Sequence, residues 1–183
     1  MIVMVVAVGF IFAPMFKVSK INPQGIPVLQ KFDWNSMKMA IYVTAPALIL
    51  HELAHKFVAL GFGYEAVFHA AYLYLAIGIA MRLLKFPFIF FVPAFVSISS
   101  NGVPLIGLNP LADALISVAG PLMNLLLWLV PKYILKFNAN LKRQTKIVLM
   151  VTSKINMFLF FINMIPIGPF DGAHFFKALF SMF

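Results

Sequence analysis

Cysteine is absent from this chain of 183 residues, and charged residues make up only 10% of it. The absence of cysteine excludes disulfides and thiolate metal sites, so histidine, aspartate and glutamate are the strong metal ligands that remain. The shortage of charge excludes an ordinary soluble domain, in which about a quarter of the residues are charged. With 63% hydrophobic residues, the composition instead predicts an integral membrane protein.

Acidic residues are the scarcest charged type: five, against 14 lysines and arginines. Burying a carboxylate in hydrocarbon is costly unless it is paired or binds a metal, so an acid inside an apolar segment is informative. The net charge of +9 is typical of basic residues at the ends of membrane spans, where they contact lipid headgroups. We therefore expect the lipid bilayer as a partner and no nucleic acid.

The apolar runs predict an all-α polytopic membrane protein with about five to six apolar segments. A final stretch, 172–183, is too short to cross a bilayer and is expected to form a short helix. The length fits a single transmembrane core domain, 1–183, with no separate soluble domain. The apolar runs are 1–16, 39–62, 66–81, 110–130 and 147–165.

Residues 86–108 differ from the other apolar segments. Pro87 and Pro93 interrupt a run rich in β-forming residues, which disfavours a continuous helix. Asn101-Gly102 is a typical hairpin turn. We predict a re-entrant or β-hairpin-like element here, buried in protein or lining a wet cavity, because exposed irregular backbone is not tolerated in hydrocarbon.

A His-Glu-x-x-His pattern at residues 51–55 lies inside the apolar segment 39–62. On a helix, His51 and His55 stand one turn apart on the same face, so both imidazoles can reach one zinc ion. Glu52 is placed to take a proton from water at that ion. The alternative, two histidines satisfied by packing hydrogen bonds, requires several buried partners for three titratable groups in one turn.

A catalytic zinc has three protein ligands and one open position. Of the acids after the motif, Glu65 lies beyond the expected helix end, and Asp113 suits the first turn of a helix that begins at Asn109-Pro110. Asp171 follows a segment broken by prolines and glycine and reaches the depth of the histidines if an even number of crossings separates residues 63 and 109. We predict Asp171 as the third ligand; the alternative is a turn aspartate before glycine.

Three motifs in order give the chain a family resemblance: HELAH at 51–55, GPLMN at 120–124, and NMIPIGPFDG at 163–172. Together they resemble the site-2 protease family of intramembrane zinc metallopeptidases, over about residues 40 to 180. That family pairs a His-Glu-x-x-His helix with an Asn-x-x-Pro-x-x-x-x-Asp-Gly segment that supplies the third ligand. Ala173 departs from the pattern, since many relatives have a second glycine there.

The resemblance implies an intramembrane zinc metalloendopeptidase with one catalytic zinc ion. It implies that His51, His55 and Asp171 bind this ion and that Glu52 is the general base and acid, while Asn124 and Gly120 contact the substrate. The reaction would be cleavage of a transmembrane segment of a membrane protein substrate by zinc-activated water, as in regulated intramembrane proteolysis. The element at 86–108 would then pair with an unwound substrate segment.

Several alternatives stay open. The same ligands would serve a non-catalytic membrane protein that binds or transports a divalent metal, although a carrier has no need of Glu52. A multi-pass protein of the cell membrane is expected, but its orientation is unresolved: the basic loops at 17–38 and 131–146 favour one side as cytoplasmic, and the resemblance favours the other. The physiological substrate and the oligomeric state are not predicted.

Overall fold

The computed structural model describes residues 2–13, 20–21, 27–28, 34–84, 94–100, 103–104 and 109–183. Most of the described residues are helical, and the chain divides into two compact units. The first contains Met1–Pro46 and Ala70–Pro93, and the second contains Ala47–His69 and Ala94–Phe183. Among the described residues, three helices are long and apolar enough to cross a membrane: α2 (Trp34–Gly61), α4 (Pro110–Phe137) and α5 (Arg143–Asn163).

The first unit holds two short helices, α1 (Ile2–Phe12) and α3 (Tyr72–Leu83), which pack against each other. The Arg82 guanidinium lies 5.5 Å from the centre of the Phe10 ring. Both helices are shorter than the roughly 20 residues that span a bilayer. The three candidate spans among the described residues do not confirm the predicted count of five to six apolar segments. The strands β1 (Lys20–Ile21) and β2 (Pro27–Val28) pair antiparallel.

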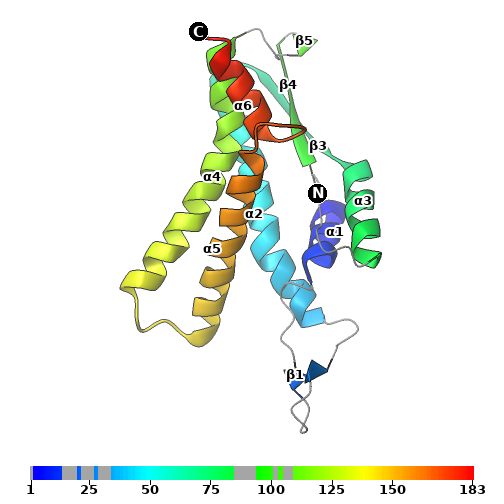
Figure 1. Ribbon diagram of the computed structural model, residues 1–183, viewed down its shortest axis with the longest axis vertical. Coiled ribbons are helices and arrows are strands. Elements are labelled where there is room, and N and C mark those ends of the chain that lie inside the picture. The colour runs from blue at the N-terminus through cyan, green and yellow to red at the C-terminus, as the bar shows by residue number, and fades with distance from the viewer. Residues whose placement is uncertain are drawn as a thin grey trace. The chain divides into compact units, whose positions relative to one another are not determined.

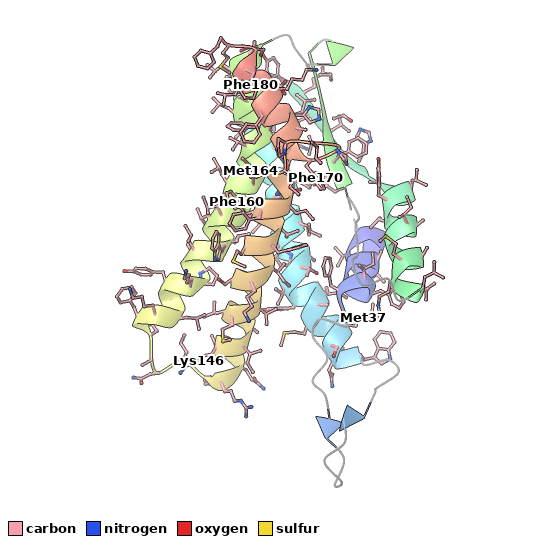
Figure 2. The ribbon with its side chains drawn as sticks, viewed as in Figure 1. Met37, Lys146, Phe160, Met164, Phe170 and Phe180 are labelled. Atoms are coloured by element: carbon pink, nitrogen blue, oxygen red, sulfur yellow. The ribbon has the colours of Figure 1, made fainter. Side chains whose placement is uncertain are left out.

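The second unit is built on the hairpin of α4 and α5, with the short helix α6 (Asp171–Phe180) packed on α4 (Figure 1). The α4 helix begins as predicted: the Asn109 side chain accepts a hydrogen bond from the Ala112 amide at 3.2 Å, and Pro110 is the first helical residue. This cap satisfies one of the amides that a helix start leaves without an internal partner. In Figure 2, Lys146 and Met164 lie near opposite ends of α5.

The predicted end of the fourth span was wrong. Residues after 130 were expected to form a loop that begins at Pro131, but α4 continues through Pro131 to Phe137. A proline removes one backbone donor without forbidding helical residues after it, and leucine and lysine, which favour helix, follow. Lys136 in the last turn also complements the helix dipole.

A three-stranded sheet in the second unit has the order β3-β4-β5, formed by Glu65–Ala70, Ala94–Ser100 and Val103–Pro104. The β4–β5 pair is antiparallel, with Ser99 opposite Pro104. The hairpin expected within 86–108 is therefore confirmed over these two strands; residues 85–93, 101–102 and 105–108 lie outside the described residues. The run 66–81, predicted as one apolar segment, instead begins as strand β3.

The sheet packs on α2, the helix that carries the histidine motif, and on α4. A small core of Ala59, Ala66, Ala112 and Ile116 joins the end of α2 to β3 and the first turns of α4. Val96 and Ile98 of β4 pack against this core. The alanines allow the backbones of α2 and α4 to approach closely, and this approach determines which α4 groups face the motif.

Candidate metal centre

The three residues of the motif lie on the part of α2 that belongs to the second unit. His51, Glu52 and His55 are all buried, with exposures of 5%, 7% and 7%. The four-residue spacing brings the two imidazoles together, and their ring centres lie 4.7 Å apart in an edge-to-face arrangement. The Glu52 carboxylate interacts electrostatically with both histidines and with Asp171.

Asp171 reaches the histidines through the break between α5 and α6. Gly168 adopts a φ of 67° in this connection, a conformation that favours glycine. Gly172 then packs on the end of α5 so closely that a Cβ there would lie 2.5 Å from the Met164 carbonyl oxygen. Met164 and Phe170 flank the connection in Figure 2. The chain therefore delivers the Asp171 carboxylate in the first turn of α6.

The three side chains present one ligand atom each to a common point. Asp171 Oδ2 lies 3.1 Å from His51 Nε2 and 3.4 Å from His55 Nε2, and the two Nε2 atoms are 3.1 Å apart. Ligand atoms of a tetrahedral zinc site with bonds of about 2.0–2.1 Å lie about 3.3–3.4 Å from one another. The arrangement thus fits three ligands of one zinc ion, and the Asp171 side chain is 26% exposed.

Hydrogen bonds on the far side of each imidazole orient these Nε2 atoms. His55 Nδ1 lies 2.7 Å from the Ile116 carbonyl oxygen, and His51 Nδ1 lies 2.5 Å from Asn124 Oδ1. The Ile116 carbonyl can only accept a hydrogen bond, so His55 donates from Nδ1, and a neutral His55 keeps its Nε2 lone pair for a metal. Both partners belong to α4, so the packing of α4 on α2 holds both rings.

Gly120 lies where α4 passes closest to the two rings. A Cβ at this position would be 2.6 Å from His51 Nε2 and closer still to His55 Nε2. Real Cβ atoms essentially never make contacts under 3.0 Å. Position 120 therefore has no room for a side chain, and a backbone without one borders the candidate zinc position.

The electrostatics of the group favour an ionised Asp171. Burial acts to raise the pKa of the Asp171 carboxyl, but the imidazoles of His51 and His55 beside it outweigh burial and hold that pKa below its ordinary value. The ionised carboxylate is the form that binds a metal. Two other acids have partners outside the group: Asp113 bonds Ser117, and Glu65 accepts a hydrogen bond from Ser99 at 3.3 Å.

The structure brings the residues predicted from the sequence together: four form one group, and two lie against its histidines. His51, Glu52, His55 and Asp171 form the inner group, and Gly120 borders it. Asn124 has no exposed surface, and protein groups occupy both ends of its amide; its predicted contact with substrate stays a prediction.

One residue of this region was missed by the sequence analysis. Asn156 of α5 is fully buried and accepts a hydrogen bond from Asn124 Nδ2 at 2.9 Å. Its position in the middle of the apolar segment 147–165 could have identified it. Polar groups buried in membrane helices have polar partners, so an amide there indicates a contact with another polar group.

No family model matches the chain, and no solved structure matches it. A protein of Methanocaldococcus jannaschii named "putative zinc metalloprotease" is 32% identical over 134 residues, which cover 73% of this chain. The chain is similar to that protein. The matched part of this chain spans 66% of the relative's length, just under two thirds. The name of the relative agrees with the His-His-Asp group, which could hold a metal.

Proposed function

We propose that this protein is an intramembrane zinc metalloprotease of the site-2 type, which cleaves a transmembrane segment of a membrane protein substrate. The observation that carries the proposal is the group of three ligand atoms, 3.1–3.4 Å apart, beside Glu52 on a helix apolar enough to cross a membrane. The similarity to a protein named as a zinc metalloprotease supports it.

In this proposal, His51, His55 and Asp171 hold the zinc ion, and Glu52 moves the proton. Zinc, when bound, supplies a Lewis acid that lowers the pKa of water and polarises the scissile carbonyl. The Glu52 carboxylate accepts a proton from the attacking water and delivers it to the leaving amine. Glu52 is not one of the three ligands, so its carboxylate is free for this task. The buried site limits the water that competes for these groups.

The substrate in this proposal is a membrane-spanning helix that unwinds locally. Peptide bonds inside a helix are protected by their own hydrogen bonds, so an extended segment must form before attack. Among the described residues, β5 pairs only with Ser99 and Ser100 of β4, and the preceding part of that β4 edge has no described partner strand. An unwound segment can add to this edge by main-chain hydrogen bonds. A multi-pass location in the cell membrane is part of the same proposal.

The test is the Glu52→Gln variant in purified, detergent-solubilised protein. We expect cleavage of a model transmembrane substrate to be lost while zinc stays bound, because the amide cannot accept the proton and the three ligands are intact. Glu65→Gln is the matched control, since Glu65 is the other glutamate and contacts Ser99 rather than the histidines. Full activity of Glu52→Gln would refute the mechanism. Divalent metal transport without any cleavage by the unmodified protein would favour a metal carrier instead.

A further inference from the structure

A chain of side-chain amides links His51 to the backbone of α5. His51 Nδ1 lies 2.5 Å from Asn124 Oδ1, Asn124 Nδ2 lies 2.9 Å from Asn156 Oδ1, and Asn156 Nδ2 lies 2.8 Å from the Thr152 carbonyl oxygen. Both asparagines are fully buried, with 0% exposure. These contacts join three helices, α2, α4 and α5, through one line of hydrogen bonds.

The donors and acceptors along these hydrogen bonds are fixed by the last acceptor, the Thr152 carbonyl oxygen. A backbone carbonyl oxygen can only accept, so Asn156 must turn its NH₂ group towards Thr152. The Asn156 side-chain oxygen then faces Asn124 and must receive a hydrogen bond. Asn124 therefore turns its NH₂ group towards Asn156. The Asn124 oxygen consequently faces His51, and this oxygen requires a donor. The His51 proton must therefore sit on Nδ1, which leaves the Nε2 lone pair facing Asp171 and His55.

We propose that Asn156 is a positioning residue for the metal centre: through Asn124, it selects the His51 tautomer that can bind a metal. The inference deepens the proposed function, since it rests on zinc binding at His51, His55 and Asp171. His55 needs no such relay because its Nδ1 donates directly to the Ile116 carbonyl, which is itself an obligate acceptor. The two histidines are thus fixed by different means, one by a main-chain atom and one by two side chains.

Without Asn156, the Asn124 amide loses its directional restraint. Turned by half a rotation, Asn124 would offer its NH₂ group to His51 Nδ1 and stabilise the tautomer with the proton on Nε2, which cannot bind a metal through Nε2. Loss of an outer-shell partner of this kind typically reduces metal affinity about 10–100-fold. Zinc itself selects the correct tautomer, so the defect is a weaker site rather than an abolished one.

The first experiment compares Asn156→Leu with Ser153→Ala in the full chain in detergent micelles. Ser153 is the matched control: it is also buried on α5 and bonds the Trp128 carbonyl of α4 at 3.0 Å, outside the relay. We expect zinc affinity, measured by competition with a chelator, to fall about 10–100-fold in Asn156→Leu and to stay unchanged in Ser153→Ala. Equal affinity of Asn156→Leu and the unmodified protein would overturn the inference.

A second measurement reads the tautomer directly. Nitrogen NMR of isotopically labelled histidine in the zinc-free chain, at a pH where the imidazoles are neutral, should show His51 protonated on Nδ1, and a mixture of tautomers in Asn156→Leu. His55 should keep its Nδ1 proton in both proteins and serves as an internal control for folding. A single Nδ1–H tautomer of His51 in Asn156→Leu would contradict the inference. If the unmodified protein bound no zinc, the proposed function would fail, while this measurement would still test the relay.

A double substitution separates the relay from simple packing. Asn124→Asp places two acceptor oxygens beside His51, so His51 donates from Nδ1 whichever way the side chain turns. Asn156→Leu should then cause no further loss of zinc affinity in the Asn124→Asp background, although it does so in the native background. If Asn156 acted only by filling space, its substitution would weaken zinc binding equally in both backgrounds, and the inference would be wrong.

Discussion

The Gly120→Ala substitution is the sharpest test of the metal centre because it adds one methyl group. The new Cβ would lie 2.6 Å from His51 Nε2, whereas ordinary contacts begin at 3.4 Å. The His51 ring or the α4 backbone must therefore shift by at least about 0.8 Å, and the closer His55 ring by more. Metal–ligand distances tolerate deviations of only about 0.2 Å, so the shift exceeds the tolerance at least fourfold. We expect zinc affinity to fall by more than about 100-fold, beyond the usual effect of an outer-shell change.

If α4 did not approach the histidines closely, Gly120→Ala would instead leave zinc affinity unchanged and raise the stability of the protein. Alanine is better than glycine in a helix interior by about 0.8–1.0 kcal/mol, so a harmless methyl group would raise the unfolding temperature. Zinc affinity by chelator competition and thermal unfolding of the zinc-free protein measure the two effects. Gly61→Ala is the control, since Gly61 is helical and a Cβ there meets nothing within 4 Å. Native zinc affinity with raised stability in Gly120→Ala would refute the close approach of α4 to the histidines.

Two further predictions concern the third ligand and the α4 cap. Asp171→Ala removes one of three ligand atoms, and zinc affinity should fall by more than the roughly 10–100-fold loss that an outer-shell change causes; unchanged zinc stoichiometry and affinity would remove Asp171 from the site. Asn109→Ala removes the bond to the Ala112 amide, and we expect the free energy of unfolding to decrease by about 0.5–2 kcal/mol. Denaturant unfolding measures this change, and a stability equal to that of the unmodified protein would contradict the cap.

Local patterns predicted the parts of the fold that depend on neighbouring residues. The His51–His55 pair, the Asn109 cap and the hairpin of β4 and β5 each follow from the spacing or chemistry of residues close in sequence. The end of α4 and strand β3 were misjudged for the same reason. Pro131 is a local signal against helix, and the apolar run 66–81 carries no local mark that its first part is a strand.

The sequence by itself determined which residues could hold a metal. With no cysteine and five acids, few candidate metal ligands existed. Helical periodicity placed two histidines on one face of a helix. Only the tertiary structure decided which atoms meet. The distances from Asp171 to the histidines, the close approach of Gly120 and the relay from Asn156 to His51 depend on how α2, α4, α5 and α6 are rotated and shifted against one another. Packing between helices sets those rotations and shifts, so they cannot be predicted from the residues of one segment alone.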